Sequence, residues 1–128
     1  MIYSKKTIKR FKNPKFVGEM KHPDAVGQEG NIRCGDIMKV FLKIDQDTVI
    51  KDIRFQTYGC IAAIAAADAM CELTKGKKIK DALKIKSEDI TKKLGCLPDI
   101  KIHCSVLGIE ALENAIEDYK KKRKAHDS

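Results

Sequence analysis

The spacing of hydrophobic and polar positions predicts a β-hairpin in the first half of the chain. From Asp36 to Ile44 the residues are largely β-branched or otherwise apolar, and a second run of this kind covers Val49 to Phe55 after the turn Asp45-Gln46-Asp47. A weaker pattern between Ala25 and Ile32 indicates a further strand before the hairpin. About three antiparallel strands are therefore expected.

Beyond Gly59 the pattern becomes helical. The alanine-rich segment from Ile61 to Leu73 has no polar residue before Asp68, so the first half of this helix must be buried on nearly all sides. Gly76 is expected to end it. A short helix is predicted from Ser87 to Leu94, with Ser87 as the N-cap.

Two more helices are expected near the chain ends. The segment from Tyr3 to Phe11 places apolar residues among basic ones, and Ser105 to Arg123 carries one apolar stripe at helical spacing. Strands followed by helices predict an α+β fold, with helices packed on one face of a small antiparallel sheet. At 128 residues the chain is expected to form a single domain, residues 1–128.

Composition narrows the class of protein. The 43% of hydrophobic residues argues against disorder, while no apolar run approaches the roughly 20 residues of a membrane span. The basic N-terminus lacks the apolar stretch of a signal peptide, so a cytoplasmic location without a membrane partner is expected.

The net charge of +8 raises nucleic acid as a partner. Aromatic residues are only 5%, however, and no stacking platform is visible, so an acidic protein partner is the favoured interpretation. Much of the excess charge lies near the two ends, at Lys5, Lys6, Lys9, Arg10, Lys12, Lys15 and Lys120 to Lys124.

The five cysteines are the unusual feature of the composition. An odd number without an export signal is poor material for a disulfide framework, and no C-x-x-C spacing indicates a zinc ribbon or a thioredoxin motif. Their thiols are therefore either buried and inert or chemically employed. They are Cys34, Cys60, Cys71, Cys96 and Cys104.

Local context separates these cysteines. Cys34, Cys60 and Cys104 fall in loops or at helix entries, where unpaired N–H groups favour thiolate. Cys71 lies eleven positions beyond Cys60 on the same expected helix, about 16 Å along its axis, and is interpreted as a small core residue. Cys96 stays open as a loop residue that could approach a site.

Two neighbours strengthen a metal-binding interpretation over simple packing. Asp36 is two residues from Cys34, and His103 directly precedes Cys104, so each offers a further ligand at the same place. Three scattered thiols alone would be a weak signal for a metal.

Three motifs together resemble those of the U-type iron–sulfur cluster scaffolds, the family of IscU and of the N-terminal domain of NifU. The resemblance covers nearly the whole chain and implies the same α+β fold, with a small antiparallel sheet and helices on one face. The motifs are Cys34-Gly35-Asp36, Thr57-Tyr58-Gly59-Cys60 and Lys101-Ile102-His103-Cys104-Ser105-Val106-Leu107.

This resemblance implies a scaffold rather than an enzyme. A [2Fe–2S] cluster would be assembled from iron and from persulfide sulfur supplied by a cysteine desulfurase, and then transferred to apo-proteins. The implied metal ligands are Cys34, Cys60 and Cys104, with Asp36 or His103 competing for the fourth place. Lys101 matches a basic residue of the motif that could stabilise the anionic cluster or a persulfide, and zinc could occupy the same pocket.

One loop departs from the family pattern. Members present a Leu-Pro-Pro-Val-Lys signal to an Hsp70-type chaperone, whereas this chain has Leu97-Pro98-Asp99-Ile100-Lys101 with an added negative charge. Recognition by such a chaperone is left open. The alternative function is a zinc-binding sulfur acceptor that stimulates a desulfurase, with Cys104 as the thiol that takes the persulfide.

Overall fold

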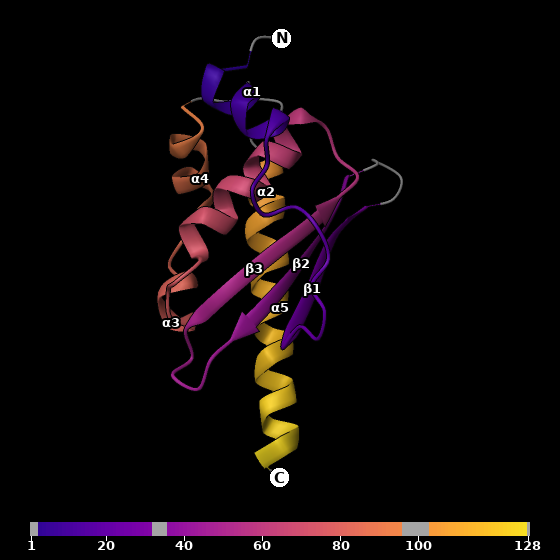
Figure 1. Cartoon of the computed structure of the whole chain (residues 1–128), viewed down its shortest axis with the longest axis vertical. Helices are drawn as coiled ribbons and strands as arrows, with labels where there is room; N and C mark the ends of the chain where they lie inside the picture. Colours follow the sequence, from indigo (N-terminus) through magenta and orange to yellow (C-terminus); the bar gives the residue numbers. More distant parts are fainter. Residues whose placement is uncertain (1–2, 32–35, 96–102, 128) are drawn as a thin grey trace.

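A three-stranded antiparallel sheet forms the centre of the fold (Figure 1). The computed structural model describes residues 3–31, 36–95 and 103–127, and their side chains except those of residues 31, 36, 103 and 124–127. The strands follow in spatial order as β1 (Ala25–Asn31), β2 (Asp36–Ile44) and β3 (Ile50–Thr57). All three predicted strands are confirmed, including the weakest.

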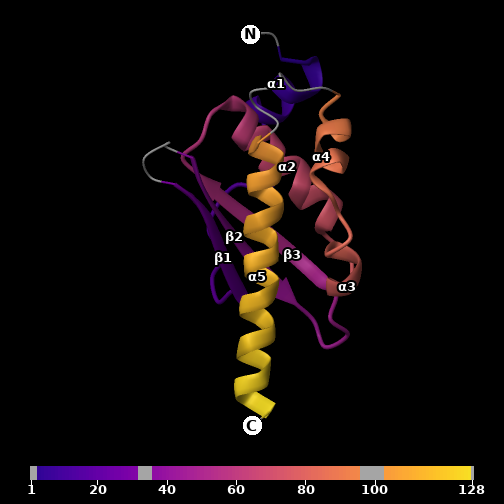
Figure 2. The same ribbon diagram turned by 180° about the vertical axis from the view of Figure 1, so that it is seen from behind.

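Helices cover one face of this sheet, as the sequence predicts. The buried helix α2 (Ile61–Thr74) packs on β3, and the long helix α5 (His103–Asp127) runs across β1 and β2 (Figures 1 and 2). Val40 and Leu42 of β2 are 0% exposed and point into the core between these layers. The opposite face carries polar side chains such as Lys39, whose ammonium lies 5.2 Å from the ring centroid of Phe41.

The contact between α5 and β1 depends on a glycine. A Cβ atom added to Gly27 would lie 2.2 Å from the backbone nitrogen of Ala115 and 2.4 Å from the carbonyl oxygen of Ala111. No side chain fits between the two backbones at this point. Gly27 therefore sets how closely α5 approaches the sheet.

The alanine-rich helix α2 is buried as expected. Seven of its first nine residues are buried, and the chain leaves it through Lys75 and Gly76, the latter with φ +87°. Cys71 is 0% exposed, and burial raises the pKa of its thiol, with the nearby Asp68 carboxylate acting in the same direction. Cys71 is thus a core residue, in agreement with the sequence interpretation.

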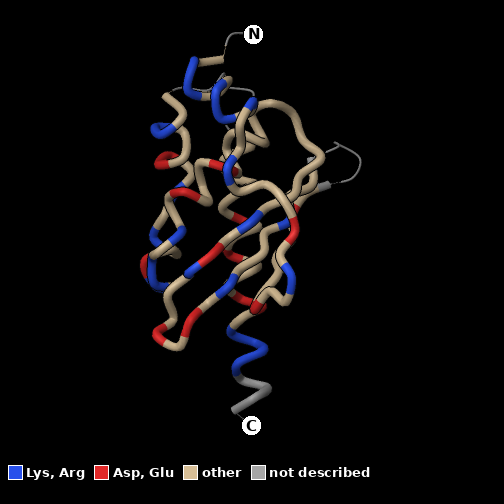
Figure 3. Tube along the Cα trace, viewed as in Figure 1, with Lys and Arg blue, Asp and Glu red and all other residues tan. Residues whose placement is uncertain are grey.

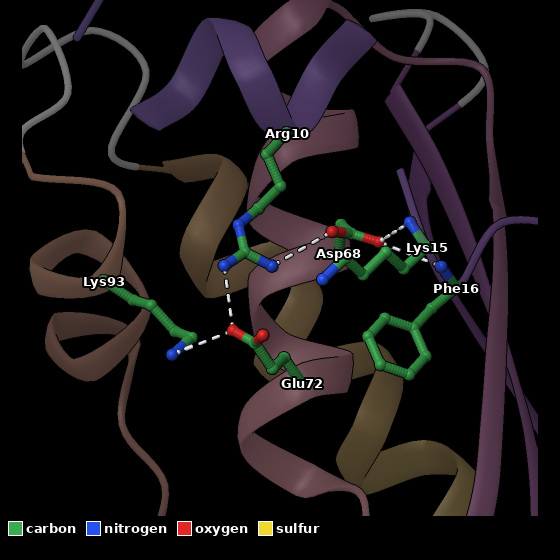
Figure 4. Close-up of polar contacts among 6 residues, drawn as sticks. All are labelled: Arg10, Lys15, Phe16, Asp68, Glu72 and Lys93. Carbon is green, nitrogen blue, oxygen red and sulfur yellow. Dashed lines mark hydrogen bonds and ion pairs between the residues drawn. The ribbon is translucent and has the colours of Figure 1, made fainter. Parts of the chain in front are cut away.

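A buried carboxylate on α2 holds the N-terminal helix α1 (Lys5–Lys12) in place (Figure 4). Asp68 is 1% exposed; its Oδ2 accepts from Nη1 of Arg10 (3.0 Å), and its Oδ1 accepts from the backbone N–H groups of Lys15 and Phe16 (2.7 and 3.0 Å). Nη2 of Arg10 also donates to Glu72 (2.8 Å). The burial of Asp68 is stabilised because both of its oxygens have donors.

The start of α1 is also tied to α4 (Ser87–Lys93). Ser4 is the N-cap of α1, and its Oγ accepts from the backbone N–H of Thr7 at 3.1 Å. The hydroxyls of Ser4 and Thr7 both donate to the carbonyl oxygen of Leu94, the C-cap of α4. Thr7 is 0% exposed at this contact.

Several local details differ from the sequence predictions, among them the start of α1 at Lys5 and the end of α5 at Asp127. The single-turn helix α3 (Ile79–Ala82) was not expected. Ser87 is the first residue of α4 and not its N-cap; Lys86 takes that place, and its backbone N–H donates to the Asp89 carboxylate at 2.9 Å. The last helix begins at His103, two residues earlier than predicted.

Among the described residues, no helix is both long enough and apolar enough to cross a membrane.

Candidate functional site

The candidate site lies at the end of the sheet where β3 leads into α2. The hydroxyl of Thr57 donates to the carbonyl oxygen of Ile37 (2.6 Å), and the backbone N–H of Tyr58 donates to the same oxygen (3.2 Å). These bonds hold the end of β3 against the start of β2. The chain therefore reaches Cys60 close to the strand end that begins with Asp36.

Two helices bring two of the predicted ligands together. Cys60 is the N-cap residue of α2, and Cys104 is the second residue of α5, whose start lies at the same end of the molecule (Figure 1). Their Sγ atoms are 3.9 Å apart although the residues are 44 positions apart in sequence. We call these two residues the cysteine pair.

The first turn of α5 is fixed by a hydroxyl contact next to Cys104. Ser105 is 0% exposed, and its Oγ lies 3.2 Å from Oγ1 of Thr91 in α4. Because the Thr91 hydroxyl donates to the carbonyl oxygen of Ser87 (3.2 Å), Ser105 is the donor in the contact with Thr91. This bond orients the helix entry that carries Cys104.

The two cysteines occupy similar positions at the ends of their helices. Both cysteines sit at helix N-termini, where backbone N–H groups lack intrahelical partners and the positive end of the helix dipole is concentrated. Neither α2, with 14 residues, nor α5, with 25, has an acidic residue in its first turn. The predicted helix-entry positions of Cys60 and Cys104 are therefore confirmed.

The separation of the two sulfurs suits a shared metal ion. Two thiolates on one tetrahedral ion, each bonded at about 2.3 Å, have their sulfurs about 3.8 Å apart. The observed Sγ to Sγ distance of 3.9 Å agrees with this value. It is far longer than the roughly 2.05 Å of a disulfide bond.

The remaining predicted site residues are placed only in part. Asp36 is the first residue of β2, opposite Asn31, and His103 is the first residue of α5, but their side chains are not among those described. Cys34, Cys96 and Lys101 lie outside the described residues, as does the 97–101 loop. Within the described part of the chain, no three His, Cys, Asp or Glu side chains converge on one point.

Two exposed apolar side chains next to the cysteine pair belong to the motifs but received no role from the sequence analysis. Tyr58 is 84% exposed two residues before Cys60, and Val106 is 39% exposed two residues after Cys104. The sequence signal for Tyr58 is its place in the motif Thr57-Tyr58-Gly59-Cys60. Both positions are suited to contact with a partner that covers the thiols.

Comparison with known proteins places this architecture in context. The family model described as NifU-like N terminal domain matches residues 2–126. The iron–sulfur cluster assembly scaffold protein IscU of Escherichia coli (strain K12) is 44% identical over 128 residues, covering 98% of this chain and 99% of that protein. IscU 1 of Archaeoglobus fulgidus is 46% identical over 121 residues, covering 94% of this chain and 78% of that protein.

A solved structure agrees with the fold. The SufU protein of Fervidobacterium islandicum AW-1 superposes with a TM-score of 0.72, over 89% of this chain and 96% of that one. Its sequence identity is 24%, so this likeness supports the α+β architecture alone.

Proposed function

Because the chain belongs to the NifU-like N-terminal domain family and is an iron–sulfur cluster assembly scaffold, not an enzyme, we propose that it builds a [2Fe–2S] cluster at the cysteine pair. The iron and sulfur are substrates that the scaffold collects and gives away. The family assigns cluster binding to the chain; the cluster type, the ligands and the order of events are the proposal.

One observation carries the proposal: the 3.9 Å between Sγ of Cys60 and Sγ of Cys104. Two thiolates at this separation fit one tetrahedral ion, so the pair would bind the same iron of the cluster. The second iron would then take Cys34, with Asp36 or His103 competing for the fourth place. Both competitors begin secondary-structure elements at this end of the sheet, at the starts of β2 and α5.

A mixed set of ligands suits a cluster that has to be transferred to another protein. Four thiolates would retain the cluster tightly, whereas a carboxylate or an imidazole provides one weaker bond. The N-termini of α2 and α5 would offset the negative charge of the thiolates and the cluster. Lys101, from the motif that contains Cys104, would act in the same direction. The scaffold would hold the cluster strongly enough to assemble it and weakly enough to donate it.

The partners follow from this chemistry. The family implies a desulfurase that supplies sulfur and apo-proteins that receive the cluster. We propose that the desulfurase delivers the sulfur as a persulfide and docks through a surface complementary to α1, whose sequence Lys5–Lys12 has no acidic residue (Figure 3). Recognition by an Hsp70-type chaperone through Leu97-Pro98-Asp99-Ile100-Lys101 stays open, and the proposed location is the cytoplasm.

A zinc-bound sulfur acceptor is the second candidate. The Sγ to Sγ distance fits zinc as well as iron, because zinc also binds thiolates tetrahedrally at about 2.3 Å. In that case Cys104 would accept persulfide while zinc occupied the pocket, and no cluster would form.

Anaerobic reconstitution separates the two candidates. The apo-protein is incubated with ferrous iron and a sulfide source, desalted, and mixed with an apo-ferredoxin. A coloured protein that passes its cluster to the ferredoxin supports the proposal. A colourless protein that binds zinc and accelerates a desulfurase supports the second candidate instead.

A further inference from the structure

A cavity of about 640 Å³ lies between α1, α2 and α4. From α2 and α4 it is lined by Asp68, Glu72 and Lys93 (Figure 4). The cavity is separate from the cysteine pair, because Asp68 is eight residues beyond Cys60 on α2, about 12 Å along the helix axis. We call it the basic cavity, since α1 and the loop after it contribute mostly basic residues: Lys6, Lys9, Arg10, Asn13 and Lys15.

One face of α1 borders the basic cavity. Lys6 and Lys9 are three positions apart, which places them on the same side of the helix. The stem of Lys6 leans toward the end of α4, where its Cδ lies 3.9 Å from the position that a Cβ atom on Gly95 would take. Lys5 and Lys12 are exposed and are not among the residues that line the cavity. The basic residues of α1 are thus divided between the cavity and the outer surface.

The two carboxylates that line the basic cavity already have cationic partners. Nη1 of Arg10 lies 3.0 Å from Oδ2 of Asp68, and its Nη2 lies 2.8 Å from Oε2 of Glu72. Nζ of Lys93 pairs with the same oxygen of Glu72 at 2.8 Å. Arg10 and Lys93 therefore balance the negative charges of Asp68 and Glu72.

The three other lysines of the basic cavity have no such partner. Among the described residues, no carboxylate forms an ion pair with the ammonium of Lys6, Lys9 or Lys15. Figure 4 shows the Lys15 side chain directed from its loop back toward Arg10. Three positive charges thus border one hollow without counterions, and their combined potential attracts an anion.

We propose that the basic cavity binds a polyphosphate group, carried by inorganic triphosphate or by a nucleoside triphosphate. A lysine ammonium is a compact point charge that binds phosphate oxygens without requiring a fixed geometry. A chain of phosphates brings several negative charges into one hollow, whereas the carboxylate of an acidic side chain brings one. The volume of about 640 Å³ lies within the roughly 300–1,000 Å³ of small-molecule sites. This inference is independent of the proposed function, because it concerns a different part of the molecule.

The walls of the basic cavity are held in place by hydrogen bonds between the three helices. Arg10 ties α1 to Asp68 of α2, and the hydroxyl of Thr7 donates to the carbonyl oxygen of Leu94 at the end of α4 (3.4 Å). The lysines are therefore carried by a fixed frame, and only their side chains need to be ordered when an anion binds. An anion held by α1 and by the loop after it would also stabilise the folded chain, because the site exists only when these segments are together.

Isothermal titration calorimetry of the full chain tests the inference, with sodium triphosphate, ATP and AMP as the probes in a low-salt buffer without divalent cations. The test variant is Lys6→Ala/Lys9→Ala. The matched control is Lys5→Ala/Lys12→Ala, which removes the same charge from the same helix but outside the cavity lining. All four side chains are exposed, so neither variant should disturb the fold, which circular dichroism checks.

Triphosphate should bind the parent and the control variant with dissociation constants within about threefold of each other. In Lys6→Ala/Lys9→Ala the dissociation constant should rise about tenfold or more, because two charged hydrogen-bond donors are lost. AMP, with a single phosphate, should bind the parent about tenfold or more weakly than triphosphate does. Equal weakening in the two variants, or AMP binding as tight as that of triphosphate, would mean a general attraction by net charge and would overturn the inference.

ATP distinguishes the two sources of the polyphosphate group. An affinity for ATP no higher than that for triphosphate means that the phosphate chain alone is recognised, whereas tighter binding of ATP means that the nucleoside adds contacts; both results uphold the site. Poly-glutamate is the probe for an acidic protein segment. If it binds to the parent and less to Lys6→Ala/Lys9→Ala, while triphosphate does not bind, the surface belongs to an acidic protein partner and the inference fails.

Thermal unfolding gives a second readout of the same site. Saturating triphosphate should raise the midpoint of unfolding in the parent and in Lys5→Ala/Lys12→Ala, and should leave Lys6→Ala/Lys9→Ala nearly unchanged. A midpoint of the parent that does not rise with triphosphate would contradict binding to the folded chain.

Discussion

The guanidinium of Arg10 and the carboxylate of Asp68 form an ion pair of 3.0 Å that joins the exposed helix α1 to the buried helix α2 (Figure 4). Asp68 is 1% exposed, so this counterion and two backbone N–H donors are needed to stabilise its buried carboxylate. We expect Arg10→Ala to lower the free energy of unfolding by about 2 kcal/mol, because it leaves a buried charge without its counterion. Urea unfolding monitored by circular dichroism measures the change.

Lys93→Ala is the matched control for Arg10→Ala. Among the described residues Lys93 pairs only with Glu72, at 2.8 Å, and both side chains are about one-third exposed. Its removal should cost less than about 1 kcal/mol, as for other surface ion pairs. Equal losses of unfolding free energy in Arg10→Ala and Lys93→Ala would mean that the buried Arg10–Asp68 ion pair contributes no more than a surface ion pair.

The Glu72 carboxylate gives the chain a predictable sensitivity to acid. The hydrogen bond from Lys93 and, to a smaller degree, the contact with Arg10 hold the pKa of Glu72 below its ordinary value of 4.5, against the opposing effect of burial. A lowered folded-state pKa means that the stabilisation is complete above the ordinary value and is lost as the pH falls through the folded-state pKa.

Glu72→Gln should therefore weaken the dependence of the unfolding free energy on pH between the ordinary and the folded-state pKa of Glu72. We expect the parent to be more stable than Glu72→Gln at pH 7, and the difference to shrink as the pH falls from the ordinary value of 4.5 through the folded-state pKa of Glu72. Urea midpoints measured at a series of pH values test this. A stability difference that stays constant down to the most acidic pH would contradict the assignment.

Gly27 should tolerate no side chain. Because its Cβ would overlap the backbone nitrogen of Ala115 at 2.2 Å, Gly27→Ala forces α5 away from β1 and should cost about 3 kcal/mol or more. Gly108 in the same helix is the control, since a Cβ there would lie 3.7 Å from Sδ of Met38, an ordinary contact. Gly108→Ala should be neutral or stabilising by up to about 1 kcal/mol, because alanine favours the helix. Thermal unfolding of both variants measures these changes in stability.

Asp36 is expected to make the cluster labile. As a ligand, its carboxylate would be a hard donor among soft thiolates and would add negative charge to the pocket, and both effects would weaken retention of the cluster. Asp36→Ala should lengthen the lifetime of the assembled cluster and slow its transfer to apo-ferredoxin, as followed by visible absorbance. Faster decay in Asp36→Ala than in the parent would remove Asp36 from this role.

Much of the fold could be predicted because local pattern and tertiary structure agree. Strand-forming runs became β2 and β3, and the alanine-rich segment became the buried helix α2. Cys60 and Cys104 were identified from their helix-entry positions and motifs, and the fold brings their sulfurs to 3.9 Å.

Other features depend on contacts that no local pattern contains. The approach of Gly27 to Ala115 arises from the crossing of β1 and α5, and Arg10 finds Asp68 from 58 positions away. The single turn of α3 is too short to show periodicity, and Lys86 replaces Ser87 as N-cap because the Asp89 carboxylate accepts from its backbone N–H. The difference in exposure between Cys60 and Cys104 likewise depends on packing.

We propose that the cysteine pair holds one iron of a cluster. The most direct measurement is the iron, zinc and acid-labile sulfide content of protein purified without oxygen, compared between the parent, Cys71→Ala and Cys60→Ser. We predict iron and sulfide in equal amounts in the parent and in Cys71→Ala, and neither in folded Cys60→Ser. Stoichiometric zinc without acid-labile sulfide in the parent, unchanged after incubation with iron and sulfide, would contradict the account.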